Sequence, residues 1–336
     1  MSESLKNRSE ILFLYDIKWA NPNGDPLDEN KPRVDPATGI NIVTDVRLKR
    51  TIRDYLHEFK GKEIFVREIE YEPGKIQDAK MRAEDFLLDN NGEKLDKSKL
   101  TLQEMRKRLY ETITQECIDI RLFGATIPIE KSSKEKSSIT LIGPVQFRFG
   151  RSLHPVEIVH IKGTGAFASG AGKEQKTFRE EYVVPYSLIC FYGVGNENAA
   201  KHTKLTEDDV KLMLEAMWYG TKNLITRSKF GQMPRFLLRV VYKERNYHIG
   251  DLDQKIVLIP RGNIEKSEIR DISDFVLDIT DLIKALKENK EKIEKIEYEI
   301  DNNLKLKVEE TEFFGKELQE HFKMDESIKI EKLGYS

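Results

Sequence analysis

The stretch "ILFLYDIKWANPNGDPLDENKPRVDPATG", from Ile11 to Gly39, joins two sequences of opposite character. Its first part, which ends at Ala20, is rich in branched and aromatic side chains and predicts a β-strand. The twenty residues from Ala20 to Gly39 contain four prolines, two glycines, three asparagines and three aspartates. Such a composition interrupts both strands and helices. We therefore expect a long, shaped loop directly after the first strand.

The segment after this loop, "VTDVRLKRTIRDYLHEF", predicts a helix over residues 45–60 that is capped at Thr44 or Asp45. Its apolar side chains share one face: Leu48, Ile52, Tyr55, Leu56 and Phe59. Lys49, Arg50 and Arg53 share the opposite face. A basic outer face is typical of an ordinary solvated helix, but it also suits a phosphate-binding surface.

The composition of the 336-residue chain, with 34% charged and 39% hydrophobic residues, is that of a folded globular protein. No apolar run approaches the roughly 20 residues that a membrane helix needs, and the N-terminus lacks the apolar core of a signal peptide. We therefore expect a cytoplasmic protein with no membrane partner. Cys117 and Cys190 lie far apart in apolar contexts, which favours buried reduced thiols over a disulfide or a metal site. No cofactor is predicted.

Positive and negative charges are distributed unevenly along the chain, although the formal net charge is only -2. From Glu265 to the C-terminus there are 13 basic and 20 acidic residues, which leaves the preceding part positive. Between Gly220 and Arg245 a single acid stands among seven basic residues: Lys222, Arg227, Lys229, Arg235, Arg239, Lys243 and Arg245. The local field decides where a phosphate backbone would lie, so the net charge does not exclude a nucleic-acid partner.

Four predicted strands and two predicted helices follow the order βαββαβ. The strands are expected at 11–20, 140–150, 181–193 and 235–243, and the helices at 45–60 and at 206–224, where Thr206 is the cap. This order is the split βαβ arrangement of ferredoxin-like and RRM domains, so the sequence predicts an α+β fold with a modified RRM-like core. The RRM aromatic signature is absent, which leaves base stacking on the sheet unsupported.

Two segments interrupt this core. Residues 61–139 have the polar breaks of an insertion, and "IKGTGAFASGAGKEQKTFRE" (Ile161 to Glu180) is rich in glycine with the lone aromatic Phe167. The glycine-rich segment suits a projecting hairpin better than a core. A dinucleotide-binding loop is excluded because no G-x-G-x-x-G opens an amphipathic helix there. Residues 251–336 are expected to form a peripheral extension, helical over "DITDLIKALKENKEKIEKIEYEI".

The run "NPNGDP...NKPRVDPATGINIVTDVRLKRTIRDYL", together with "DIRLFGA" and "GPVQFRFGRSLHPVE", resembles the backbone subunit of type I CRISPR Cascade complexes. This is the Cas-seven family of the RAMP superfamily. The resemblance is nearest to the Csh-two group of type I-B and next to the Csd-two group of type I-C. It covers residues 10–245, and the last 90 residues contribute little to it.

This resemblance implies a non-catalytic RNA-binding protein of antiviral defence. Copies of the subunit stack as a helical filament along the guide (crRNA), beside other Cascade subunits, and present the guide for pairing with target DNA. It also implies three parts: an RRM-like palm at 1–60, 140–160 and 181–250, an inserted finger region at 61–139, and a thumb hairpin at 161–180. Residues 251–336 remain as the C-terminal extension.

The resemblance transfers RNA-binding roles to the first loop and the helix after it. Asn21 and Asn23 are expected to donate amide hydrogen bonds to phosphate or ribose oxygens, and Arg33 to add a positive charge. Asp25 is expected to hold the loop. Lys49, Arg50 and Arg53 match the basic helix of the family and are the leading candidates for phosphate contacts.

Further contacts are expected downstream. "RSKFGQMPR" resembles the family's segment before the last palm strand, and its candidates are Arg227, Lys229, Gln232 and Arg235. In the thumb, Phe167 is expected to wedge beside a displaced base, with Lys173 nearby. Arg148 and Arg151 are expected to contact either RNA or a neighbouring subunit.

Two other functions compete with this reading. Backbone relatives in type III complexes cleave RNA with a first-loop aspartate and a metal, and this loop contains Asp25, Asp28 and Asp35. The second alternative is a self-assembling scaffold without RNA. The clustered basic residues favour RNA over that scaffold, because assembly alone does not require them.

Overall fold

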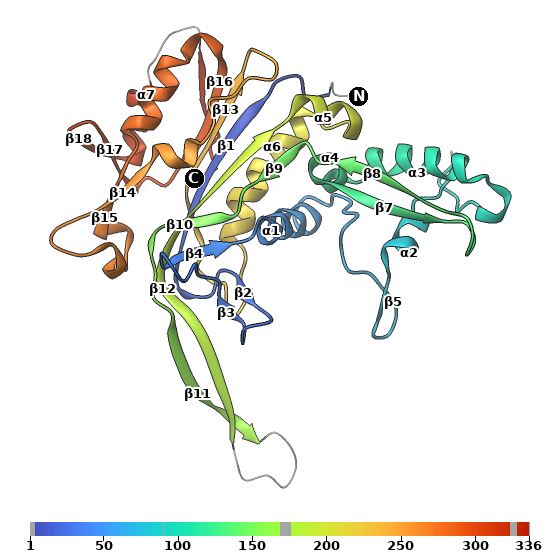
Figure 1. Cartoon of the computed structure of the whole chain (residues 1–336), viewed down its shortest axis with the longest axis horizontal. Coiled ribbons are helices and arrows are strands. Elements are labelled where there is room, and N and C mark those ends of the chain that lie inside the picture. The colour runs from blue at the N-terminus through green and yellow to red at the C-terminus, as the bar shows by residue number, and fades with distance from the viewer. Residues whose placement is uncertain (1–3, 90, 169–175, 323–327, 336) are drawn as a thin grey trace. The chain divides into compact units, whose positions relative to one another are not determined.

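The computed structural model describes residues 4–89, 91–168, 176–322 and 328–335, with the backbone alone for 164–168 and 176–179. It separates into two compact units. The first unit comprises Met1–Arg8, Ile52–Gln146 and Val194–Ala216, and the second comprises Ser9–Thr51, Phe147–Gly193 and Met217–Ser336. Both helices and strands are abundant, so the expected mixed α+β class is confirmed (Figure 1).

A nine-stranded sheet organises the second unit, with the path β19-β16-β13-β1-β12-β10-β4 and with β9 and β11 also paired to β12. Its strands are β1 (Ser9–Ala20), β4 (Ile40–Val43), β9 (Val145–Phe147), β10 (Gly150–Pro155), β11 (Val159–Ala168), β12 (Lys176–Gly195), β13 (Met233–Tyr242), β16 (Ile293–Ile300) and β19 (Lys329–Lys332). The first predicted strand, β1, therefore lies inside this sheet, between β13 and β12.

β1 is buried on both faces, which explains its nearly continuous apolar sequence. The side chains of Leu12, Phe13 and Leu14 are fully buried. β1 pairs antiparallel with β13, with Leu12 opposite Leu238, and the register shifts between Leu14 and Tyr15. The strand then ends at Ala20, where the proline-rich loop begins, so the predicted boundary is confirmed.

The strand expected at 140–150 is wrong as a single element. β8 (Lys136–Ile142) pairs with β7 (Gly124–Glu130) in the first unit, whereas β9 and β10 pair with β12. The break falls at Gly143, where a Cβ atom would lie 2.1 Å from the carbonyl oxygen of Phe123. Only glycine permits this approach, so the chain turns there instead of continuing the strand.

The helix expected across Asp278 to Ile300 is also wrong in its second half. α7 (Thr280–Glu288) ends near Asn289, and β16 follows as a buried strand paired with β13. The sequence of β16 alternates, with Ile296, Tyr298 and Ile300 separated by glutamates, which is the period of a strand. The C-terminal segment therefore extends the main sheet.

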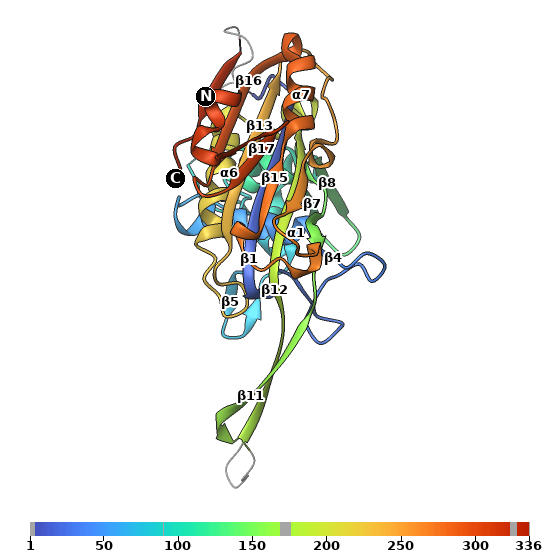
Figure 2. The ribbon, with the colours of Figure 1, turned by 90° about the vertical axis from the view of Figure 1, so that its left-hand side faces the viewer.

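The remaining elements of the second unit are short. A smaller sheet has the order β14-β15-β17-β18, and a two-stranded ribbon, β2-β3, lies within the first loop. Their bounds, with the last helix, are β2 (Gly24–Asp25), β3 (Lys31–Pro32), β14 (Val257–Pro260), β15 (Phe275–Asp278), β17 (Lys305–Val308), β18 (Thr311–Phe314) and α8 (Leu318–His321). The glycine-rich segment pairs as the β11–β12 hairpin, which extends away from the sheet in both views (Figures 1 and 2).

The first unit packs helices against the β7–β8 hairpin. Its elements are β5 (Glu70–Glu72), β6 (Lys75–Ile76), α2 (Ala79–Glu84), α3 (Leu102–Glu116), α4 (Ile118–Phe123), β7, β8, α5 (Glu197–Thr203) and α6 (Glu207–Glu215). α6 has the predicted Thr206 cap, and a π-helical turn over Ala216–Gly220 follows it. α3 and α4 are separated by Cys117, whose extended backbone bridges to Glu63.

The two cysteines, Cys117 and Cys190, are buried and free, as expected. Burial raises the pKa of both thiols, which keeps them protonated and unreactive. No helix in the described part of the chain is both long and apolar enough to cross a membrane.

Candidate nucleic-acid interface

The first loop is built onto the start of α1 (Asp45–Glu58). The Oδ1 atom of Asn23 accepts hydrogen bonds from the backbone N–H and the hydroxyl of Thr44, both at 2.9 Å. Thr44 in turn accepts a bond from the backbone N–H of Arg47 at 3.3 Å, which confirms the predicted cap. Asn23 therefore orients the N-terminus of the helix.

Asn21 is 3% exposed and serves the loop in a different way from the one expected. Its Nδ2 donates to the carbonyl oxygen of Asn30 at 2.7 Å, and its backbone N–H donates to the carbonyl oxygen of Ser228 at 2.8 Å. Its Oδ1 is buried and receives no hydrogen bond from the described residues. One N–H of the side-chain amide is engaged in this bond, and the burial of Asn21 places it among the residues that hold the loop.

The three loop aspartates are bound within the loop. Asp25 pairs with Arg33 at 2.8 Å, and Asp28 pairs with Lys31 at 2.8 Å. Asp35 accepts the hydroxyl of Thr38, and this bond, with the Ala37 N–H, lowers the pKa of Asp35. In the described ranges, no three His, Cys, Asp or Glu side chains are grouped so that they could hold a metal ion.

The basic residues of α1 do not form one available face. Lys49 pairs with Asp45 at 2.9 Å, and its side chain is only 13% exposed. The Nε of Arg53 lies 3.0 Å from the Oδ2 of buried Asp119, and the side chain of Arg53 is 11% exposed. Arg53 is thus an internal partner of the first unit, because removing a buried carboxylate from water requires a counter-charge. Of the three candidates, only Arg50 is exposed.

The basic residues before and within β13 also fall into two groups, one buried and one nearer the surface. Arg235 is 8% exposed and pairs with Asp16 at 2.9 Å and with Asp301, so it cannot contact a guide in this arrangement. Gln232 is 4% exposed. Arg227 remains on the surface, where its Nε donates to Glu181 at 2.7 Å.

Lys229 is a partly buried cation of this run that forms no ion pair with the described residues. It is half-buried, and its ammonium group donates to the hydroxyl of Ser228 at 3.1 Å. Burial lowers the pKa of Lys229, and the positive charge of Arg47 lowers it further. No carboxylate lies within ion-pairing distance of Lys229 among the residues that the structure describes. Two cations held near each other favour an anion between or beside them.

Arg47 was not among the site residues expected from the sequence, because it belongs neither to the apolar face of α1 nor to the group Lys49, Arg50 and Arg53. The guanidinium of Arg47 donates to the hydroxyl of Thr51 at 2.9 Å, one turn further along the helix. Its positive charge acts on Lys229, a residue far along the chain in the turn before β13. The sequence offered one signal for Arg47: Thr44, Arg47 and Thr51 are spaced three and four residues apart, so they lie on the same side of the helix.

The other candidates lie elsewhere in the second unit. Arg148 pairs with Asp251 at 2.6 Å and with Asp253 at 3.4 Å, and Arg151 is exposed on β10. Phe167 lies on β11, but its side chain is not described. Lys173 lies outside the described residues. The roles expected for these two thumb residues stay predictions.

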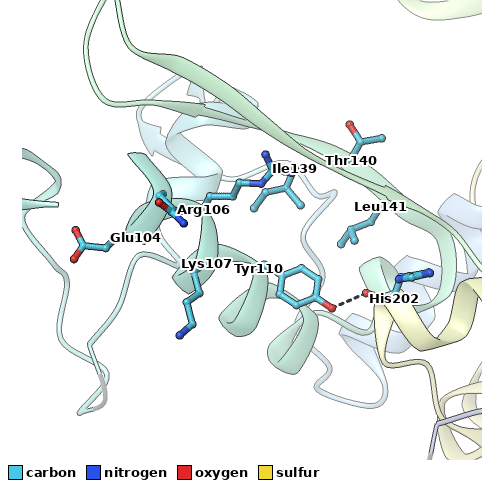
Figure 3. A pocket seen from close by; sticks show the side chains of 9 residues that line it. Glu104, Arg106, Lys107, Tyr110, Ile139, Thr140, Leu141 and His202 are labelled. Atoms are coloured by element: carbon cyan, nitrogen blue, oxygen red, sulfur yellow. Dashed lines mark hydrogen bonds between the residues drawn. The ribbon is translucent and has the colours of Figure 1, made fainter. Parts of the chain in front are cut away.

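A hollow of about 730 Å³ in the first unit is separate from all of these candidates (Figure 3). It lies between α3 and β8, with Tyr110, Ile139 and Leu141 as apolar walls and with Arg106 and Lys107 beside them. The hydroxyl of Tyr110 donates to the carbonyl oxygen of His202 at 2.9 Å.

The model of the family described as CRISPR-associated protein Cas7 matches residues 7–280. A relative from Haloferax volcanii, described by the same words, is 35% identical over 292 residues, which is 82% of this chain and 81% of the relative.

Two solved structures share the fold. They are described as "CRISPR RNA-guided surveillance complex" and "CRISPR RNA-guided surveillance complex, pre-nicking", with TM-scores of 0.50 and 0.52 and identities of 13% and 14%. Each match covers 88% of this chain, and the matches cover 90% and 93% of the solved chains. The family model and the Haloferax volcanii relative together decide the assignment: the chain belongs to the CRISPR-associated protein Cas7 family.

Proposed function

We propose that the chain is the guide-binding backbone subunit of a CRISPR RNA-guided surveillance complex. It binds crRNA through the backbone, stacks with further copies along the guide beside other Cascade subunits, and holds the bases ready for pairing with target DNA. The protein reads phosphates and shape, while base pairing reads sequence. Residue resemblance favours the type I-B group, with type I-C as the next choice.

Besides the family membership, one observation carries this proposal: Lys229 is half-buried, is influenced by the positive charge of Arg47, and has no carboxylate partner among the described residues. A structural cation in such a position is normally paired, as Arg53 and Arg235 are. A phosphate would supply the missing negative charge and accept hydrogen bonds from both side chains. Arg50, which is exposed on the same helix as Arg47, extends the basic surface.

The parts of the subunit follow from the same proposal. The strand order β13-β1-β12-β10 supports an RRM-like palm, the residues 61–139 act as the finger region, and the β11–β12 hairpin acts as the thumb. β16 and β19, which lie beyond β13 in the sheet, add the C-terminal segment to the palm.

We further propose that the subunit does not cleave RNA. Asp25 and Asp28 are each neutralised by a basic neighbour of the same loop, and Asp35 is engaged by the Thr38 hydroxyl. A metal-dependent nuclease needs carboxylates that are free to converge on an ion. The arrangement of these three side chains supports a loop-forming role.

The first test is to purify the chain, sequence any RNA that accompanies it, and incubate the particles with magnesium. We expect bound RNA that remains intact. Lys229→Ala should reduce the amount of bound RNA, because it removes a cation that a phosphate would neutralise. Lys287→Ala, which removes an exposed cation near the end of α7, is the matched control and should behave like the unchanged protein.

Two results would reject the proposal. Protein that carries no RNA and fails to bind added RNA at low salt would contradict guide binding. RNA that is cut at regular intervals with magnesium, and spared when Asp25, Asp28 and Asp35 are replaced, would favour the nuclease instead.

A further inference from the structure

The hollow between α3 and β8 in the first unit contains apolar and basic groups that the proposed guide binding does not use (Figure 3). Ile139 and Leu141 of β8 are buried, and the ring of Tyr110 on α3 completes this apolar wall. The volume of about 730 Å³ is within the range of ligand sites. None of the residues that line the hollow was among the RNA contacts expected from the sequence.

One edge of β8 has no strand beside it in the described residues, because β8 pairs with β7 alone in a separate two-stranded sheet. Ser138 lies opposite Pro128, which has no N–H to donate, so this pair is of the type that exchanges no backbone hydrogen bonds. Such pairs alternate along an antiparallel ladder, so the pair formed by Thr140 is of the same type. The N–H and C=O groups of Ser138 and Thr140 therefore point toward the open edge.

This open edge faces the hollow. The hollow touches three consecutive residues of β8, Ile139, Thr140 and Leu141. Consecutive side chains of a strand point to opposite faces, so a surface that meets all of them lies along the edge of the strand. In the described ranges, no backbone hydrogen bond reaches the outer groups of Ser138 or Thr140, and both residues are exposed. Unpaired groups of this kind are a template for an added strand.

Three cations lie at the hollow without an ion-pair partner in the described part of the chain. Arg106 and Lys107 are exposed on α3, and Lys204 lies over the aromatic ring of the apolar wall, 5.2 Å from its centre. Glu104 is the one carboxylate in the described lining, and it accepts the N–H and the hydroxyl of Thr101 in the cap of α3, both at 2.8 Å. The hollow therefore has an excess of positive charge.

These features fit a peptide better than a nucleic acid. An open strand edge forms main-chain hydrogen bonds with an extended peptide, and pockets beside it receive alternate side chains. The one aromatic ring of the wall, Tyr110, has Lys204 above it, and its hydroxyl is bonded to the carbonyl oxygen of His202. Bases bind chiefly by stacking on open aromatic faces, so this wall is better suited to an aliphatic side chain. Acidic side chains complement Arg106 and Lys107.

We propose that the open edge of β8 pairs with an extended segment of a partner protein that carries aliphatic and acidic side chains on one face. The aliphatic side chain lies against the apolar wall, and the acidic side chain lies two positions along the segment, toward Arg106 and Lys107. Alternate residues of a strand share one face, so both side chains reach the hollow from the same segment. This docking site goes beyond the proposed guide binding, since it belongs to the first unit and Lys229 belongs to the second.

A peptide titration tests this site. The probe is a dye-labelled peptide of about nine residues in which threonine alternates with valine and glutamate in turn. Its control has lysine in place of each glutamate. We expect the acidic peptide to bind the unchanged protein at least roughly tenfold more tightly than the basic peptide, as measured by dye anisotropy. The affinity of the acidic peptide should fall as the salt concentration rises.

Two pairs of variants separate the backbone contact from the charge contact. Thr140→Pro removes the outward N–H at an edge position, where proline is tolerated, and should weaken peptide binding by roughly tenfold. Thr140→Val keeps this N–H and is the matched control. Lys107→Glu should weaken binding about three- to tenfold, whereas Arg108→Glu, at the next residue of α3 and in a different hollow, should have a smaller effect. Thermal unfolding checks that each variant is folded.

Peptide binding that is lost in Thr140→Pro and kept in Thr140→Val supports strand addition. Equal binding to these two variants overturns it, and so does an acidic peptide that binds no more tightly than the basic one. RNA binding that depends on Thr140 and Lys107 would assign the hollow to a nucleic acid instead. Self-association of the unchanged protein that Thr140→Pro abolishes would assign the edge to a second copy, and either result overturns the proposal. We expect Thr140→Pro to bind RNA like the unchanged protein, which keeps this test separate from guide binding.

Discussion

The basic run from Lys222 to Arg245 contains two regions that look alike in sequence and differ in the fold. Within β13, Arg235 and Arg239 are buried and paired with carboxylates. In the turn before β13, Arg227 is exposed and Lys229 is half-buried beside Arg47. The first region neutralises the acids of the sheet, whereas in the second Arg227 forms an exposed pair with Glu181 and Lys229 has no carboxylate partner among the described residues. The density of basic residues therefore locates an interface only after the buried pairs are removed.

Arg239→Leu should have the largest effect on stability. Arg239 is fully buried and lies 2.9 Å from Glu297, so the substitution removes the buried one of the two cations that pair with this carboxylate; the other is Lys295, at 2.6 Å. We expect a loss of about 3–5 kcal/mol in the free energy of unfolding, measured with denaturant. Arg227→Leu, at the exposed pair, should cost less than about 1 kcal/mol. Equal losses would remove the distinction between the two regions.

Arg53→Leu tests the same distinction on α1. Its partner Asp119 is buried and also accepts the backbone N–H groups of Phe65 and Val66. We expect a loss of about 3 kcal/mol in stability from the unpaired carboxylate. Arg50→Leu, at an exposed position of the same helix, should leave stability unchanged and weaken RNA binding. The reverse pattern in calorimetry and binding assays would restore Arg53 as a guide contact.

His154 extends the comparison to a buried group without a counter-charge. Burial lowers the pKa of His154 to about 4, against an opposing hydrogen bond to the carbonyl oxygen of Pro155. Its unfolded pKa is about 6.5, so the unfolded state binds more protons between these values and stability falls as the pH falls from about 6.5 to 4. We expect a loss of up to about 3 kcal/mol. His154→Gln should flatten this part of a stability profile, and an unchanged slope would reject the assignment.

Gly24→Ala should have the smallest effect, confined to the first loop. A Cβ atom there would lie 2.1 Å from Oδ1 of Asn30 and 2.7 Å from its carbonyl oxygen, the acceptor of the Asn21 amide. We expect the loop to shift at a cost of about 1–2 kcal/mol and RNA binding to weaken. Leu27→Ala, at a side chain that is 96% exposed, is the control within the loop and should change neither quantity.

Local sequence was sufficient for the features that local chemistry determines. The end of the first strand at Ala20, the Thr44 and Thr206 caps and the glycine-rich hairpin all follow from residues within a few positions of one another. The family resemblance of the first loop was confirmed by comparison. These signals need no knowledge of distant partners.

The missed features depend on contacts between distant residues. β16 forms a strand because the edge of β13 is available and because Arg239 neutralises Glu297. The pairing of Arg53 could not be read from the local sequence, because its partner Asp119 lies 66 residues away. In both cases the local sequence pattern fits more than one structural role, and pairing with a distant residue determines which role the segment takes.

The salt dependence of RNA binding tests the central claim most directly. The unchanged protein, Lys229→Ala and Lys287→Ala are titrated with a single-stranded RNA over a series from about 50 to 200 mM salt. We predict that affinity falls steeply with salt and that Lys229→Ala reduces the logarithmic slope by about 0.7, the value for one phosphate contact on a single strand. Lys287→Ala should leave the slope unchanged. A flat salt dependence, or equal slopes for all three proteins, would contradict phosphate binding at Lys229.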